Sequence, residues 1–104
     1  MGLVKRGEVY WVNLDPTIGT EIKKIRPGLI VSPDDMNVAL PRVIIAPLTS
    51  KGQPLGSRPE LVFNDKPGKI LLDQIRSVDK RRLGAKLGEI DIQVWHATLL
   101  EMLS

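Results

Sequence analysis

The 104 residues, 42% of them hydrophobic and 26% charged, have the composition of one soluble globular domain, and we expect residues 1–104 to form it. The chain contains no cysteine, which excludes disulfides and thiolate chemistry, and no apolar run approaches the roughly 20 residues of a membrane helix. Its start lacks a signal peptide, so we expect a cytoplasmic protein without membrane contact, and the net charge of +3 mildly favours polyanionic partners.

Short apolar runs separated by turn residues predict a chain built mainly of β-strands. The first run alternates between apolar and polar residues until Pro16 breaks it, and the chain resumes an extended path at Pro27. A later β-branched run is expected to end at Pro47, because proline donates no hydrogen bond to a sheet. The predicted strands span residues 9–14, 29–31, 43–46, 61–63, 69–72 and 75–78, with a loop at 50–59 and a turn at 64–68.

The C-terminal segment changes to a helical period. The pattern predicts an amphipathic helix over residues 89–103. Spacings of 3, 4 and 4 residues place four apolar side chains on one stripe of it: Ile92, Trp95, Leu99 and Leu103. Asp91 or Glu89 is expected to cap the helix at its N-terminus. Several short strands followed by a helix predict a mainly β fold with helices (α+β), arranged as a small, strongly bent barrel with the helix packed on it.

A polar loop dense in opposite charges follows the first strand, and it holds Glu21, Lys23, Lys24 and Arg26. The planar guanidinium of Arg26 matches two phosphate oxygens, and Glu21 is a candidate base for a ribose 2′-hydroxyl. Thr49 adds a hydroxyl donor at the end of a later strand. These groups suit the cleavage of an RNA phosphodiester, in which the 2′-hydroxyl attacks and no metal is needed. Spacing alone favours the simpler interpretation, a solvated ion pair between Glu21 and Arg26.

Six short motifs follow one another along the chain. In order they read RGEVYW (6–11), DPTIGTE (15–21), RP (26–27), VSP (31–33), APLTS (46–50) and LDQIRS (72–77). Each motif alone is common, but their order and spacing are specific. On these residues the chain resembles the MazF/PemK toxins of bacterial type II toxin–antitoxin systems over nearly its full length, as a single toxin domain.

The resemblance implies an SH3-like or CcdB-type barrel with a C-terminal helix, and the activity of a metal-independent, cofactor-free endoribonuclease (an mRNA interferase). It implies single-stranded RNA as substrate, with 2′,3′-cyclic phosphate and 5′-hydroxyl products, a homodimer, and a cognate antitoxin with an acidic tail. The family's catalytic pair corresponds to Arg26 and Thr49, and Glu21 lies in the family's active site. The expected RNA contacts are Thr20, Lys23, Lys24, Ser50, Lys51, Gln74 and Arg76.

The chain departs from one branch of this family, the Kid/PemK type. Leu71 stands where that branch has a catalytic arginine, and the first loop has no histidine, so its acid–base arrangement cannot operate here. Asp73 is then expected to be structural, hydrogen-bonding backbone groups at a turn. His96, the single histidine, is expected on the flank of the terminal helix, and one histidine with scattered carboxylates predicts no metal site.

A basic run opposed only by Asp79 is expected either as a solvated face or as a track for an RNA backbone or an acidic partner. It consists of Arg76, Lys80, Arg81, Arg82 and Lys86. Trp11 and Trp95 are expected in the core or in a dimer contact rather than as platforms for bases. Two rival functions stay open at this point: a CcdB-like toxin that binds a protein without catalysis, and a nucleic-acid-binding barrel without activity.

Overall fold

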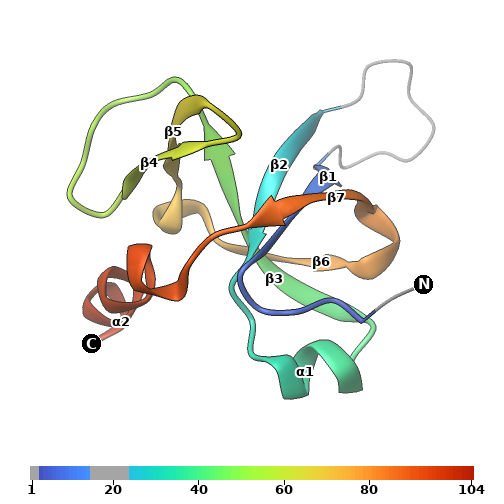
Figure 1. Ribbon diagram of the computed structural model, residues 1–104. Coiled ribbons are helices and arrows are strands. Elements are labelled where there is room, and N and C mark those ends of the chain that lie inside the picture. The colour runs from blue at the N-terminus through green and yellow to red at the C-terminus, as the bar shows by residue number, and fades with distance from the viewer. Residues whose placement is uncertain (1–2, 15–23) are drawn as a thin grey trace.

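The computed structural model describes residues 3–14 and 24–104 (Figure 1). Within them, seven strands form a strongly curved sheet in the order β4-β5-β3-β2-β1-β7, with β6 also paired to β3. The strands are β1 Glu8–Asn13, β2 Ile25–Ile30, β3 Arg42–Thr49, β4 Glu60–Phe63, β5 Lys66–Ile70, β6 Arg76–Asp79 and β7 Leu83–Glu89. The helices are α1 Asp34–Ala39 and α2 His96–Leu103, with 3-10 turns η1 Leu72–Gln74, η2 Lys80–Arg82 and η3 Ile92–Val94. No helix among the described residues is long and apolar enough to cross a membrane.

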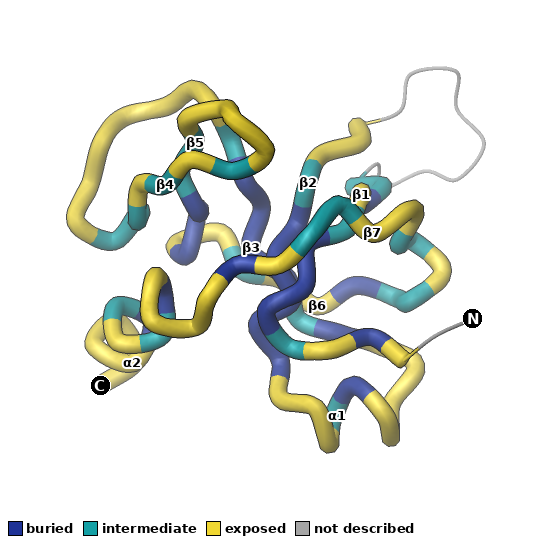
Figure 2. Tube along the Cα trace, viewed as in Figure 1, coloured by how far each residue is buried: buried dark blue, intermediate teal, exposed yellow. Residues whose placement is uncertain are grey.

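Two apolar clusters hold the curved sheet together. One surrounds Val9 and Leu29 and includes Trp95 and Leu99, through which the C-terminal segment docks on the sheet. The other surrounds Val12 on the opposite side of β1. Figure 2 shows the buried positions following the central strands, while the outer surface of α2 is exposed. The arrangement confirms the predicted mainly β fold, a strongly bent, barrel-like sheet with a C-terminal helix.

The prolines do not bound strands as predicted. Pro27 lies inside β2, opposite Trp11, and Pro47 lies inside β3, opposite Gly28. A proline is compatible with a strand wherever its missing N–H faces no acceptor, which the sequence pattern does not reveal. The turn before β5 is also shorter than predicted. Asn64 and Asp65 alone make it, with φ angles of 50° and 64°, so β5 begins at Lys66.

The terminal helix begins later than predicted. Glu89 belongs to β7, and Asp91 caps the 3-10 turn η3 by accepting a hydrogen bond from the N–H of Gln93 at 2.8 Å. The α-helical period starts only at His96. The 3-10 turn changes the phase of the apolar stripe before His96, so Ile92 is 42% exposed. Leu103, in the last turn of α2, is 69% exposed, and the buried contacts of the stripe reduce to those of Trp95 and Leu99.

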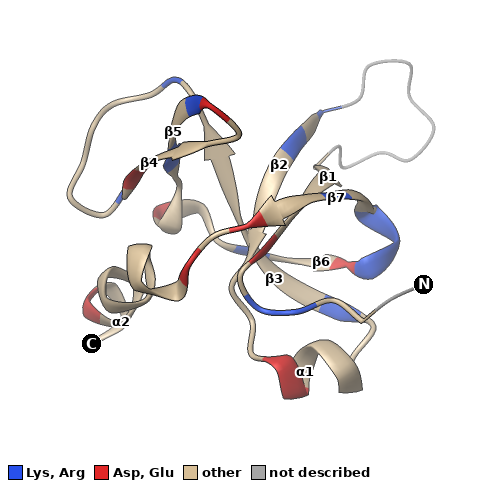
Figure 3. Cartoon of the chain, in the orientation of Figure 1, with Lys and Arg blue, Asp and Glu red and all other residues tan. Residues whose placement is uncertain are grey.

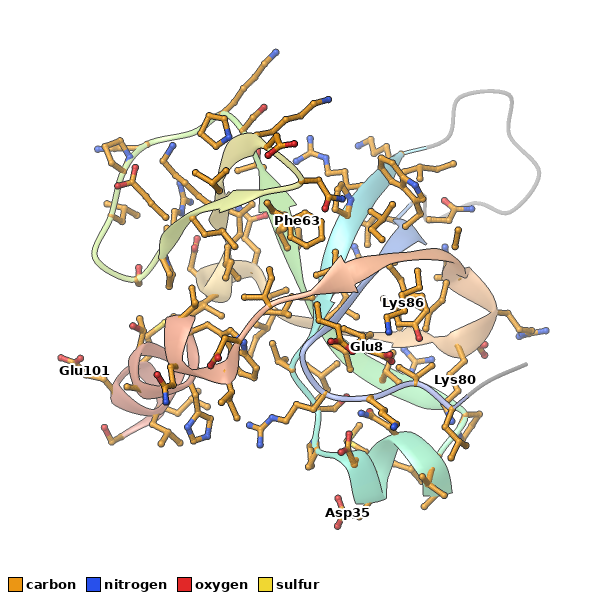
Figure 4. The ribbon with its side chains drawn as sticks, viewed as in Figure 1. Glu8, Asp35, Phe63, Lys80, Lys86 and Glu101 are labelled. Carbon is orange, nitrogen blue, oxygen red and sulfur yellow. The ribbon has the colours of Figure 1, made fainter. Side chains whose placement is uncertain are left out.

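A buried carboxylate fastens β1 to β7. The side chain of Glu8 accepts hydrogen bonds from the backbone N–H of Lys5 at 2.6 Å and from the hydroxyl of Tyr10 at 2.9 Å, and its second oxygen lies 2.7 Å from Nζ of Lys86 (Figure 4). Burial alone raises the pKa of Glu8, but these hydrogen bonds and the Lys86 charge outweigh it and the pKa is lowered. Burial and the neighbouring carboxylate raise the pKa of Tyr10 to about 12.

Glu8→Gln is expected to lower the free energy of unfolding at pH 7 by about 2 kcal/mol, because hydrogen bonds to a charged group are lost from a buried site. A pKa lowered on folding adds stability above the unfolded pKa, and this stability is lost as the pH falls through the folded pKa. The difference between wild type and variant should therefore be full at pH 7 and shrink below about pH 4. Urea titrations at several pH values test this, and a difference that stays constant down to pH 2 would contradict it.

Candidate functional site

A cleft opens beyond the last residue pair between β2 and β3. The β2–β3 pairing ends at Pro47, while Leu48 and Thr49 pair with Ile70 and Lys69 of β5 on the other edge of β3. Pro27 has no N–H with which to continue the β2–β3 ladder, while the carbonyl of Pro47 faces the opposite edge of β3 and accepts a hydrogen bond from the N–H of Leu71 at 2.8 Å. The resulting cleft has a volume of about 380 Å³. It is lined by Trp11, Arg26, Pro27, Leu48, Thr49, Ser50, Phe63, Asn64, Lys66, Pro67, Gly68 and Leu87.

Arg26 and Thr49 face each other across this cleft. The β2–β3 register pairs Gly28 with Pro47, and two further residues along each antiparallel strand bring Arg26 opposite Thr49. Residues two apart on a strand share a face, so both side chains lie on the face of Gly28 and Pro47. Both line the cleft. Two residues that lie 23 positions apart in the sequence, 26 and 49, thus meet at one site.

The two side chains differ in how they are held. Arg26 is exposed, and within residues 3–14 and 24–104 no side chain forms an ion pair with it. Its guanidinium is therefore available for an anion as far as these residues are concerned. Thr49 is half-buried at the end of β3, and its Oγ1 accepts a hydrogen bond from the backbone N–H of Lys51 at 3.1 Å. This bond orients the hydroxyl and leaves its proton to be donated.

The other expected site residues divide into three groups. Ser50 lines the cleft, and Lys51 follows it as an exposed residue whose backbone orients Thr49. Lys24 precedes β2 and is exposed, while Gln74 ends η1 and Arg76 begins β6, and these three do not line this cleft. Outside the described residues lie Thr20, Glu21 and Lys23.

Sequence reasoning missed the hairpin side of the cleft. Phe63, Asn64 and Lys66 come from the β4–β5 hairpin and line the wall that faces β2. Figure 3 shows basic segments on both β2 and this hairpin. Trp11 is 41% exposed and lines the cleft, so the core position considered for it is wrong, whereas Trp95 is fully buried as expected. The available signal was the turn pair Asn64-Asp65, which places two strands in a hairpin but does not say what they face.

The loop after Thr49 is fastened at its far end. Nε and Nη2 of Arg58 each donate to one carboxylate oxygen of Asp73 at 2.9 Å, and Nη1 donates to the carbonyl of Gln53 at 3.1 Å. The guanidinium lowers the pKa of Asp73, and the carboxylate raises the pKa of Arg58. Asp73 is thus structural as expected, but its main partner is the side chain of Arg58, which anchors residues 50–59, and a backbone hydrogen bond at Asp73 itself adds to it.

The basic run is more strongly paired than predicted. Lys86 lies 2.7 Å from Glu8 and 3.2 Å from Glu89, so Asp79 is not the only opposing charge. Arg81 pairs with Asp79 at 3.2 Å, and Arg82 donates to the carbonyl of Asn13. The turn between β6 and β7 that carries this run lies on the other side of the molecule from the β4–β5 hairpin (Figure 3). The run is therefore in part a structural network, away from the hairpin wall of the cleft.

His96 and the carboxylates of residues 3–14 and 24–104 are not among the residues that line the cleft. His96 is the first residue of α2, and its ring meets Trp95 edge-on with centroids 5.9 Å apart. This is the predicted position on the helix, outside the residues that line the cleft. Among the described residues, no three His, Cys, Asp or Glu side chains are grouped so that they could hold a metal ion.

Comparisons with known proteins extend over nearly the whole chain. A sequence profile described as the PemK-like, MazF-like toxin of type II toxin–antitoxin systems matches residues 5–101. Endoribonuclease EndoA of Bacillus subtilis is 36% identical over 95 residues, which cover 86% of this chain and 82% of EndoA. Among solved structures, MazF of Deinococcus radiodurans superimposes with a TM-score of 0.81 at 27% identity, covering 99% of this chain and 98% of that one. A mycobacterial endoribonuclease in complex with its cognate antitoxin gives 0.80 at 25% identity, covering 96% and 94%.

Proposed function

The chain belongs to the PemK-like, MazF-like toxins of type II toxin–antitoxin systems, and from this premise we propose that it is an endoribonuclease that cleaves single-stranded RNA without a metal ion. The observation that carries the proposal is the meeting of Arg26 and Thr49 in one cleft. A cation and a neutral donor at one site suit a phosphate whose negative charge grows during the reaction. The similarity to the endoribonuclease EndoA and to the mycobacterial endoribonuclease supports the same activity.

In the proposed reaction, the ribose 2′-oxygen attacks the adjacent phosphorus and the bond from phosphorus to the 5′-oxygen breaks. Glu21, which lies outside the described residues, takes the proton of the 2′-hydroxyl, and the departing 5′-oxygen takes up a proton. Arg26 donates to two oxygens of the crowded phosphorane, and Thr49 donates its hydroxyl to the same group. The products are a 2′,3′-cyclic phosphate and a 5′-hydroxyl end. The nucleophile belongs to the substrate, so no metal-bound water is needed.

Excess EDTA is expected to leave cleavage of a long synthetic RNA by the purified protein unchanged, with cuts at discrete sites. Because His96 lies on α2, outside the cleft, His96→Ala should also leave the shape of the pH–rate profile unchanged. Loss of cleavage in EDTA with recovery in Mg²⁺ would refute the 2′-hydroxyl mechanism. Binding of the RNA without cutting would favour a plain nucleic-acid-binding barrel, and the absence of both would favour a toxin that acts on a protein.

The proposed partners follow from the same site. The antitoxin is proposed to place an acidic, extended tail along the cleft, where Arg26 and Lys66 would meet its carboxylates. The mycobacterial endoribonuclease that superimposes on this chain was solved in complex with its cognate antitoxin, which supports a protein partner of this kind. Because the tail and the RNA would bind the same cleft, the antitoxin would inhibit RNA cleavage by competing with the substrate.

The chain is expected to form a homodimer that survives dilution to low micromolar concentration. A chain of 104 residues has a small core, and large apolar side chains stay exposed around its C-terminal end. They are Ile92, Val94, Leu100, Met102 and Leu103. Sedimentation equilibrium should give twice the chain mass of 11.6 kDa, and a species of 11.6 kDa alone under these conditions would count against the dimer.

A further inference from the structure

Half of the cleft is built from side chains that phosphate chemistry does not require. Beside Arg26 and Thr49, its walls are formed by the apolar groups of Trp11, Pro27, Leu48, Phe63, Pro67 and Leu87. Ligand pockets combine apolar walls of this kind with a few polar groups that orient the ligand. The apolar half of the cleft therefore suits a second part of the ligand, joined to the phosphate.

One wall of this half is an aromatic side chain that the fold leaves uncovered. Trp11 lies in β1 opposite Pro27 of β2, next to the residue that carries the guanidinium. It is 41% exposed, whereas Trp95 is fully buried in the core. An exposed tryptophan beside an arginine, in a concave site, is typical of a binding surface rather than of packing.

The facing wall is held in place by β7. The ring of Phe63 extends from β4 toward the space between the β4–β5 hairpin and β2 (Figure 4). Its edge lies so close to Gly88 that a Cβ there would come within 3.1 Å of Cζ, and Nδ2 of Asn64 donates to the carbonyl of Leu87 at 3.4 Å. The hairpin is thus seated on β7, and the Phe63 ring is fixed before any ligand arrives.

We propose that Trp11 and Phe63 form a nucleobase subsite, which receives a base adjacent to the phosphate held by Arg26 and Thr49. The inference rests on the proposed function and adds to it a second contact with the substrate, made through a base rather than through the phosphate. Stacking of the flat faces of bases on aromatic side chains is the usual mode of single-strand RNA recognition. The volume of about 380 Å³ lies within the roughly 300–1,000 Å³ of small-ligand sites, enough for a nucleotide unit.

The test uses an RNA that the protein itself selects. Cuts made by wild type in a long synthetic RNA are mapped first, in EDTA. A ten-nucleotide RNA spanning the major cut is then made with a 2′-O-methyl group on the attacking ribose, which prevents cleavage, and with an abasic residue at each position in turn. Dissociation constants are measured for wild type, Trp11→Ala and Phe63→Ala. Val62→Ala, at the 71% exposed neighbour of Phe63 outside this cleft, is the control.

In wild type, an abasic residue at one position beside the cut should weaken binding about tenfold or more, the usual effect of losing a stacked base. Trp11→Ala should weaken binding of the intact RNA by a similar factor, and the same abasic residue should then cost nothing further, because the two changes remove one contact. Trp11→Tyr should restore most of the affinity, and Val62→Ala should behave as wild type. Abasic and Trp11→Ala losses that multiply would overturn the subsite.

The outcomes separate the two proposals. Discrete cutting by wild type together with multiplying losses refutes the subsite and leaves the nuclease standing, and the aromatic pair would then suit an apolar side chain of a protein partner. Absence of cutting refutes the nuclease, and the subsite with it. Trp11 is an exposed strand residue, so its variants should melt within a few degrees of wild type. Should Trp11→Ala unfold, the same comparison of intact and abasic RNA is made with Phe63→Leu, which alters the other aromatic side chain of the subsite.

Discussion

Arg26→Ala is expected to lower the rate of RNA cleavage at least a hundredfold while the melting curve stays that of wild type. Removing a charged group that contacts the transition state typically costs on the order of 3 kcal/mol of transition-state stabilisation. The fold should not respond, because Arg26 is exposed and no ion pair with another described residue is lost. The measurement is single-turnover cleavage of a defined RNA, with thermal denaturation of the same protein preparation.

The matched control is Arg42→Ala. Arg42 begins β3, whereas Thr49 ends it, and its guanidinium bonds Oγ and the carbonyl of Ser77, both at 2.9 Å. The variant loses the same positive charge far from the cleft, so cleavage should continue at the wild-type rate. If Arg26→Ala and Arg42→Ala behaved alike, the effect would reflect net charge, and the site would have to be placed elsewhere.

Trp95→Ala is expected to lower the free energy of unfolding by about 3–5 kcal/mol, the range for removing a fully buried aromatic side chain. The Trp95 ring joins the C-terminal segment to the sheet core, and the guanidinium carbon of Arg6 lies 5.3 Å from its centre. Domains of this size have only about 5–15 kcal/mol of stability, so the variant should be close to unfolding at ordinary temperature. Denaturant titration measures the change.

Trp11→Ala provides the comparison for this prediction. It removes the same side chain from a position that is 41% exposed rather than fully buried, so the loss should be no more than about 1 kcal/mol. Equal losses at the two positions would mean that α2 is not docked through Trp95.

The sequence pattern predicts the centre of the sheet better than its edges. The run around Val43 is too short for a helix and is β-branched, which favours a buried strand, and the alternation in β1 indicates one buried face. β7 was not predicted because Gly84 and Gly88 dilute its signal, although both lie in the strand. α1 was also missed, since its start, Pro33 with two aspartates in the first turn, equally resembles a turn.

Only those site residues that the family resemblance names could be predicted from the sequence. Arg26 and Thr49 follow from motif order, but their meeting depends on the register between β2 and β3 and on where that pairing ends, which are properties of the whole sheet. Phe63 lies 52 positions after Trp11, and nothing local in either segment indicates that they share a cleft. Non-local pairing of this kind is set by tertiary packing rather than by period or propensity.

The Arg58–Asp73 ion pair fixes the far end of the loop that follows Thr49. One end of the loop at 50–59 is continuous with β3, and the other is pinned to η1 through both oxygens of Asp73. Residues 54–57, between Gln53 and Arg58, can be exchanged or lengthened at small entropic cost, since closure entropy grows only with the logarithm of loop length. Foreign sequence can therefore be inserted at the tip of this loop without displacing the hydroxyl of Thr49.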